Sequence, residues 1–85
     1  MQYISLSELA KHNIEFDCWI SLHGIVYDVT DFMKTHPGGY AIMKYAGQDC
    51  TEQFTKTHSK NLNIEKRIGK YKKGFLEKNW ILIVL

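Results

Sequence analysis

The clearest pattern along the chain is a pair of short segments rich in β-branched, aromatic and other apolar residues. Residues 18–22 and 25–29 have this character, and only His23-Gly24 separates them. A two-residue connection that ends in glycine is typical of a β-hairpin, because the favoured turn places its central residues at positive φ angles. The sequence therefore predicts two antiparallel strands joined at His23-Gly24.

The polar and apolar positions on either side of this hairpin predict short helices. Ser5-x-x-Glu8 is a capping box, in which the two side chains satisfy free amides at the start of a helix that ends near residue 11. Thr30 is expected to cap a helix over residues 31–35, which must stop at His36 because a residue before proline is disfavoured in the helical region. The remaining predicted elements are helices over residues 40–47, 49–56 and 61–66, and a strand over residues 67–71.

This order of elements places helices in the middle of the chain and strands on either side of them. It indicates an α+β fold, with short helices that form a pocket on a small mixed sheet. A chain of 85 residues has room for one domain. We expect that domain to cover residues 1–73, and residues 74–85 to form a C-terminal tail that is packed on the core or truncated.

Composition changes this picture only slightly. The hydrophobic fraction of 45% and the aromatic fraction of 13% are those of an ordinary folded domain. The net charge is +2, and seven lysines and arginines between positions 56 and 73 supply most of the basic residues. Because no recognition motif and few aromatic residues accompany them, a solvated face is expected rather than a nucleic-acid interface. We expect a monomer.

Cys18 and Cys50 indicate whether the protein works in an oxidising or a reducing compartment. They form neither CxxC nor CxxCH, so they predict two buried free thiols and not a zinc pair or covalent haem attachment. A disulfide would need an oxidising compartment, and the first residues lack the basic and then apolar run of a secretory signal. The sequence therefore favours an intracellular, cytoplasmic location.

The apolar residues 80–85 at the end of the chain allow three interpretations. They could form a flap packed on the core, the start of a membrane anchor, or an interaction segment. Six apolar residues are too few for a transmembrane helix, which needs about 20. Packing on the core is favoured, because an exposed apolar edge promotes aggregation.

His36 has the most distinctive surroundings of the four histidines. Pro37 fixes its backbone, and Gly38-Gly39 removes side chains beside it, so a large flat group could approach the imidazole. His12 lies in a polar turn and His23 in the hairpin, and both are expected to have structural roles. The pattern indicates a cofactor site at His36.

Several motifs together resemble the haem-binding domain of the cytochrome b5 family. The motifs are VYDVTDF at residues 26–32, HPGG at 36–39, AGQDCTEQF at 46–54 and HS at 58–59. Tyr3 and Trp19 also fall at matching positions, and the resemblance covers about residues 3–71. HPGG alone would be moderate evidence, whereas its combination with the other motifs is specific.

The resemblance implies that His36 and His58 bind the iron of one non-covalent haem b from opposite faces. Both must be neutral imidazoles, each oriented by an acceptor on its other ring nitrogen. Because protein then fills both axial positions, no open site remains for substrate, and electron transfer is the chemistry left. We therefore expect a one-electron carrier and not an enzyme, working between a reductase and an acceptor.

The resemblance also implies the walls of the pocket. Ser59 corresponds to a residue whose hydroxyl and amide approach a haem propionate. The segment after it is shorter than in familiar members, so Leu62 and Ile64 compete for one position in the wall. The expected cofactor-binding residues are Leu22, Val29, Phe32, Pro37, Gly38, Ile42, Met43, Phe54, Ser59 and Leu62.

Three alternatives remain beside the electron carrier. A zinc site that combines these histidines with the cysteines lacks the close ligand pairs of structural zinc sites. A module that binds or senses haem or a small ligand is disfavoured, because non-haem relatives of the family lose the histidine of HPGG. The third alternative is a haem domain of a larger oxidoreductase.

The pocket rim departs from the family. Well-known members carry acidic residues that dock basic partners, whereas this chain has Tyr40, Ala41, Tyr45 and Lys56 near those positions. Because charge complementarity steers such encounters, we expect a partner without a strongly basic docking patch. Fewer negative charges near the iron should also raise its reduction potential.

Overall fold

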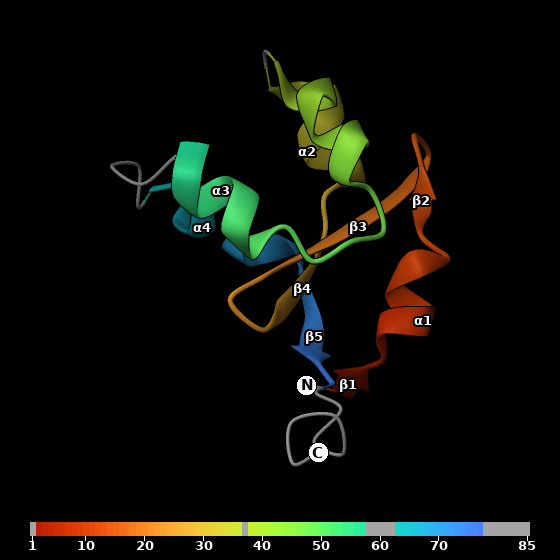
Figure 1. The fold of residues 1–85 in the computed structure, drawn as a ribbon. Helices are drawn as coiled ribbons and strands as arrows, with labels where there is room; N and C mark the ends of the chain where they lie inside the picture. The colour runs from red at the N-terminus through yellow and green to blue at the C-terminus, as the bar shows by residue number, and fades with distance from the viewer. Residues whose placement is uncertain (1, 37, 58–62, 78–85) are drawn as a thin grey trace.

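The centre of the computed structural model is a mixed five-stranded sheet in the order β1-β5-β4-β3-β2 (Figure 1). The structure describes residues 2–36, 38–57 and 63–77. β1 and β5 run parallel, whereas the other neighbouring strands run antiparallel. The α+β fold expected from the sequence is confirmed. The strands are β1 (Gln2–Ile4), β2 (Asn13–Ile14), β3 (Asp17–Leu22), β4 (Ile25–Asp28) and β5 (Lys72–Leu76).

The predicted hairpin joins β3 to β4. Leu22 pairs with Ile25 across the turn. His23 has a φ of 50° and Gly24 a φ of 80°, so both central residues take the positive angles that this two-residue turn requires. The amide of His23 also donates to the Thr51 hydroxyl at 2.9 Å, which links the turn to a helix far along the chain. The hairpin prediction is confirmed.

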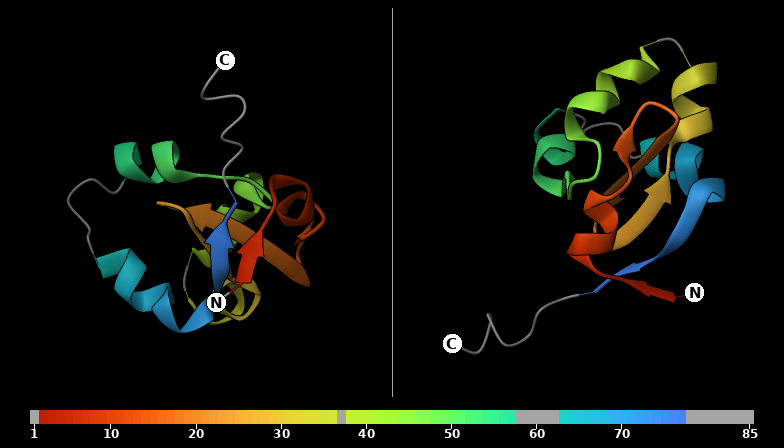
Figure 2. Two further views of the ribbon diagram at one scale, coloured as in Figure 1. Left: turned by 90° about the horizontal axis from the view of Figure 1, so that it is seen from below. Right: turned by 90° about the vertical axis from the view of Figure 1, so that its right-hand side faces the viewer.

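The two faces of the sheet carry separate apolar cores, because successive side chains of a strand point to opposite faces. Ile20 and Leu22 of β3 belong to the larger core on the face covered by most of the helices. Val26 of β4 belongs to the smaller core on the other face, together with Ile4 and Leu9. Two further views show the sheet between these layers (Figure 2). The larger core is therefore where a helical pocket can form.

Helices of one or two turns, together with short turns, connect the strands in the described chain. None of them combines the length and the apolar character that crossing a lipid bilayer requires. The helix expected over residues 40–47 is a 3-10 helix, labelled η1, and it ends at Tyr45. The helices are α1 (Leu6–Ala10), α2 (Thr30–Thr35), η1 (Gly39–Tyr45), α3 (Thr51–Thr57), α4 (Asn63–Ile68) and η2 (Gly69–Tyr71).

The strand expected over residues 67–71 is wrong. This segment contains the end of α4 and all of η2. Ile68 is buried in the larger core and Tyr71 packs against the same core. A spacing of three residues places both side chains on one face of a helix but on opposite faces of a strand. The last strand therefore begins only at Lys72.

Helix caps were expected at Ser5 and at Thr30, and the structure contains only the first of them. The Ser5 hydroxyl accepts the amide of Glu8 at 3.0 Å, so the Ser5 half of the capping box is confirmed, whereas the Glu8 carboxylate contacts His12 and Lys11. Thr30 does not cap α2, because it is the first residue of that helix. Its hydroxyl donates to the Asp28 carboxylate at 2.6 Å and accepts the Cys18 amide at 2.9 Å. Thr30 therefore fixes the start of α2 to β3.

The two ends of the described chain meet in the parallel pair of β1 and β5. Gln2 pairs with Gly74, and a Cβ atom at Gly74 would collide with the Gln2 carbonyl oxygen. Glu77 continues the contact by donating its amide to the Ile4 carbonyl at 2.7 Å. The boundary expected after residue 73 therefore falls inside β5, since the chain must reach Leu76 to complete the pairing with Ile4.

Candidate functional site

His36 lies directly after α2, on the side of the sheet that carries the larger core. Its backbone is extended, with φ −118° and ψ 131°, and its amide donates to the Phe32 carbonyl at 3.2 Å. The prediction that the helix ends before His36 is confirmed. Pro37, which was expected to fix this geometry, lies outside the described residues.

The imidazole of His36 has a defined tautomer. Its Nδ1 lies 3.2 Å from the Phe32 carbonyl oxygen and 3.0 Å from the Thr35 hydroxyl. A carbonyl oxygen only accepts hydrogen bonds, so Nδ1 must carry the proton in this contact. The lone pair is then on Nε2, as in a histidine oriented to bind a metal ion. The ring also stacks on Phe32, with 4.1 Å between centroids and 20° between planes.

The two glycines after His36 have different roles. Gly38 takes a φ of 77°, which a glycine adopts without strain, and starts η1. A Cβ atom at Gly39 would lie 2.8 Å from both the Cα and the carbonyl oxygen of Met33. The interpretation that Gly39 leaves room for a flat group is therefore wrong, since the backbone of α2 takes up that space. The glycine instead lets η1 pack closely on α2.

Most of the predicted apolar lining comes together in the larger core. Met43 packs against this core, whereas Gly38 is exposed and directly precedes η1. His58, Ser59, Leu62 and Pro37 lie outside the described residues, so the second expected ligand has no position here. The predicted residues that share the buried cluster are Leu22, Val29, Phe32, Ile42 and Phe54.

Hydrogen bonds to β3 fix the segment that leads into α3. Gly47 donates its amide to the Trp19 carbonyl at 2.7 Å, and Cys50 donates to the Ser21 carbonyl at 3.0 Å. Phe54 of α3 is buried in the larger core, and its ring lies edge-on to Tyr45 at 6.3 Å. Because Thr30 ties α2 to the same strand, β3 positions both α2 and α3.

Tyr71 is a wall residue that sequence reasoning missed. Its ring lies edge-on to Phe32, with 6.4 Å between centroids and 74° between planes. Phe32 in turn stacks on His36, so η2 borders the histidine through two aromatic contacts. The helical spacing of Ile68 and Tyr71 was the signal that could have identified this part of the wall.

His12 lies away from this site, on the other side of β3, with the side chain of Trp19. Its Nε2 is 2.8 Å from Glu8, its Nδ1 is 2.8 Å from Asp17, and its ring stacks on Trp19 at 3.5 Å. Partial burial lowers the pKa of His12, but the hydrogen bonds and charges of Asp17 and Glu8 outweigh it and raise the pKa. The structural role predicted for His12 fits this cluster, which the spacing of Glu8 and His12 could have indicated.

Cys18 and Cys50 are buried free thiols, as the sequence predicted. Burial raises the pKa of Cys18 to about 11 and that of Cys50 to about 12. Both thiols are therefore protonated near neutral pH and are poor nucleophiles and metal ligands. In the described part of the chain, no group of three or more His, Cys, Asp and Glu side chains is arranged to hold a metal ion.

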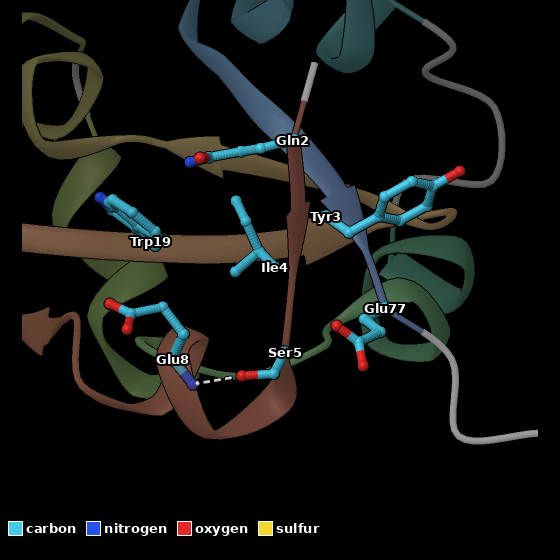
Figure 3. A pocket seen from close by; sticks show the side chains of 7 residues that line it. All are labelled: Gln2, Tyr3, Ile4, Ser5, Glu8, Trp19 and Glu77. Atoms are coloured by element: carbon cyan, nitrogen blue, oxygen red, sulfur yellow. Dashed lines mark hydrogen bonds between the residues drawn. The ribbon is translucent and has the colours of Figure 1, made fainter. Parts of the chain in front are cut away.

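A cavity of about 350 Å³ opens beside β1 and α1, at a distance from the residues of the larger core. None of the residues predicted to bind the cofactor lines it. In Figure 3, Tyr3 points to the other side of β1 from Gln2 and Ile4. The lining residues are Gln2, Tyr3, Ile4, Ser5, Glu8, Trp19 and Glu77.

The fold and the site together define a class of protein: a small α+β domain in which a histidine lies beside an apolar cluster of strands and short helices. The chain belongs to the family of cytochrome b5-like haem/steroid-binding domains, whose model matches residues 5–77. This finding agrees with the resemblance carried by the sequence motifs.

Three curated relatives are larger proteins in which only a short segment matches this chain. L-lactate dehydrogenase (cytochrome) of Saccharomyces cerevisiae is 47% identical over 73 residues, which cover 85% of this chain and 12% of the relative. The Δ8-fatty-acid desaturase of Borago officinalis is 55% identical over 67% of this chain and 13% of its own length. Nitrate reductase [NADH] of Petunia hybrida is 51% identical over 76% of this chain and 8% of its own length. The chain thus spans a small part of these proteins.

Solved structures of small cytochromes share the fold over nearly their whole length. Cytochrome b5 of Ostreococcus tauri virus 2 has a TM-score of 0.75 and 43% identity, over 87% of this chain and 95% of that chain. Cytochrome b558 of Ectothiorhodospira vacuolata has a TM-score of 0.77 and 30% identity, over 89% of this chain and 99% of that chain. The fold of this chain therefore accounts for nearly all of each of these two solved chains.

Proposed function

We propose that the chain carries one electron at a time through one non-covalent haem b, with His36 and His58 as the axial ligands. The observation that carries this proposal is the contact between Nδ1 of His36 and the Phe32 carbonyl oxygen, because a neutral imidazole that donates from Nδ1 has its lone pair on Nε2 to bind iron. When bound, the haem would supply an iron that alternates between its ferric and ferrous states. Two protein ligands would leave no coordination site for substrate, so the chain itself has no catalytic step.

The residues around His36 fit such a cofactor. The buried side chains of Leu22, Val29, Phe32, Ile42 and Phe54 provide an apolar lining, and Met43 packs beside them. Apolar surroundings exclude water from a porphyrin and favour its burial. We assign Pro37, Gly38 and Leu62 to the same pocket and Ser59 to a propionate.

We place this carrier in the cytoplasm as a monomer that works between a reductase and an acceptor protein. Its two protonated, buried thiols suit a reducing compartment. The second candidate is a haem domain of a larger oxidoreductase, which is favoured by relatives in which the matched segment makes up 8–13% of the enzyme. In either setting the residues of this chain have the same task, which is to hold the haem and exclude water from it.

The visible spectrum of the purified protein tests the proposal. We expect low-spin bands of bis-imidazole haem in the oxidised protein and a sharp shift when dithionite is added. A colourless protein that takes up no added haem would refute the proposal and favour a module for another small ligand.

Substitution of single histidines tests the ligand assignment. His36→Ala or His58→Ala should give a five-coordinate, partly high-spin haem that is held more weakly. The matched controls are His12→Ala and His23→Ala, which should leave the bands unchanged because His12 contacts Glu8 and Asp17 and His23 lies in the turn between β3 and β4. A spectrum that responds to His12 instead of His36 would contradict the assignment.

A further inference from the structure

Charge is divided unevenly between the two parts of the chain. Residues 1–29 contain one lysine and four acidic residues, which gives a net charge of −3. Residues 30–73, which include α2, η1, α3, α4 and η2, contain nine lysines and arginines and four acidic residues, which gives +5. Residues 74–85 are neutral overall. The positive charge therefore belongs to the part of the chain that contains His36.

Exposed lysines lie on each of the elements that border His36. Lys34 is on α2, two residues before the histidine, and Lys44 is on η1. Lys70 is on η2 beside Tyr71, whose ring contacts Phe32. The ammonium of Lys44 lies 5.1 Å from the ring centre of Tyr45, and that of Lys70 lies 5.2 Å from the ring centre of Tyr71. We call these three exposed lysines, Lys34 on α2, Lys44 on η1 and Lys70 on η2, the lysine surface.

Aromatic side chains add to the recognition properties of this surface. Tyr40 of η1 is 49% exposed, although most large apolar side chains of the helical face are buried. Tyrosine is enriched in protein interfaces because it offers a rigid apolar ring and a polar tip. Exposed lysines on the same elements suit an anionic protein surface better than a basic one.

A redox partner must approach from this side of the molecule. Electron transfer slows steeply with distance, and His36 lies on the helical face of the sheet, whereas α1 and the acidic Glu8 lie with the smaller core on the opposite face. We propose that the partner docks an acidic protein surface against the lysine surface. This inference rests on the proposed electron-transfer function and adds the charge of the partner to it.

Electron transfer to two forms of one acceptor tests the inference. The haem-loaded, reduced protein is mixed with native cytochrome c, which is basic, and with cytochrome c whose lysines are succinylated, which is acidic. We expect the bimolecular rate constant with the succinylated form to fall as the salt concentration rises, because screening weakens attraction between opposite charges. The rate constant with the native form should not fall.

Charge reversal locates the docking surface. The double variant Lys34→Glu/Lys44→Glu should lower the rate constant with succinylated cytochrome c at low salt by about tenfold, a modest part of the range that electrostatic steering spans. The matched control, Lys11→Glu/Lys73→Glu, makes the same change of charge away from His36. For each variant, the rate constant with native cytochrome c is divided by that with the succinylated form. A change in driving force caused by the variant affects both rate constants and therefore cancels in this ratio.

Each outcome decides one of the two claims. A normal bis-histidine spectrum combined with faster, salt-weakened transfer to native cytochrome c would overturn the inference and leave the proposed function intact. Equal effects of the two double variants on the ratio would also overturn it. Absence of haem binding would refute the proposed function itself, and the inference with it.

Discussion

The orientation of His36 depends on groups within the preceding turn of α2. The Phe32 carbonyl and the Thr35 hydroxyl hold its Nδ1, and the Phe32 ring stacks on the imidazole. Contacts so close in sequence form as soon as α2 forms. A histidine prepared in this way loses little conformational entropy when it binds a metal ion.

Gly39, three residues after His36, has no room for a larger side chain. A Cβ atom there would lie 2.8 Å from the backbone of Met33, which cannot move without displacing α2 from η1. We expect Gly39→Ala to lower the free energy of unfolding by about 1–3 kcal/mol, the usual effect of forcing extra atoms into a packed site, and to weaken haem retention. Urea unfolding followed by circular dichroism measures the first effect.

Gly69→Ala is the matched control for this variant. A Cβ atom at Gly69 has no neighbour within 4 Å, and the residue does not take a positive φ. Its unfolding midpoint should stay close to that of the natural sequence. Equal midpoints for the two variants would show that close packing of η1 on α2 does not contribute to stability.

At the scale of elements, the His12 cluster joins α1 to the start of the sheet. Glu8 comes from α1, Asp17 and Trp19 come from β3, and His12 lies between them. The amide of Trp19 also donates to the His12 carbonyl at 2.9 Å. One imidazole therefore connects a helix and a strand on the face of the sheet opposite to His36.

The stability supplied by this cluster should depend on pH. Because the pKa of His12 is raised above its ordinary 6.5, its contribution is complete below about pH 6.5 and is lost as the pH rises through the folded-state value. The pKa of Glu8 is lowered from 4.5, mainly by the hydrogen bond from His12, so its contribution is lost as the pH falls through its own folded-state value. The cluster should therefore stabilise the protein most between about pH 5 and pH 6.5.

His12→Phe tests this dependence, because phenylalanine keeps a ring beside Trp19 and removes both hydrogen bonds. The difference in unfolding free energy between the natural sequence and the variant should be largest near pH 6 and should shrink by pH 9. Its size should be about 1 kcal/mol or less, as measured for partly exposed ion pairs. A difference that stays constant from pH 6 to pH 9 would show that folding does not raise the pKa of His12.

The elements also show how far the sequence could be used for prediction. The His23-Gly24 turn and the Ser5 cap were predicted correctly because turns and caps depend on neighbouring residues. β1 was not predicted, since Gln2–Ile4 becomes a strand only by pairing with β5 near the other end of the chain. Residues 67–71 were misassigned because their β-forming composition matters less than the helical spacing that buries Ile68.

The candidate site was likewise predicted in part from the sequence. The position of His36 and most of its apolar lining followed from motifs that can be recognised in the sequence. The contact of Tyr71 with Phe32 did not, because it joins helical elements that are far apart along the chain. The proton on Nδ1 also required the structure, since a carbonyl oxygen had to be located beside the ring.

At the scale of the whole molecule, the uneven charge bears on the reduction potential. Positive charge near the iron favours the ferrous state, which carries less positive charge than the ferric state. A unit charge roughly 10 Å away contributes about 0.4 kcal/mol in a dielectric as high as that of water. The positive charge of residues 30–73 should therefore raise the potential relative to family members with an acidic rim.

Redox titration of single variants measures this effect. Lys44→Glu should lower the potential because it replaces a positive charge on η1 with a negative one. Lys11→Glu makes the same change on the opposite face, beyond α1, and should have a smaller effect. A potential that rises in Lys44→Glu would contradict the argument from charge.

The hydrogen bond between the Glu77 amide and the Ile4 carbonyl brings the first and last strands of the described chain side by side. In Figure 1 this pair lies at the bottom of the molecule and α2, which His36 follows, lies at the top. We therefore expect polypeptide joined to β1 or β5 to lie away from His36 and to leave haem uptake unchanged.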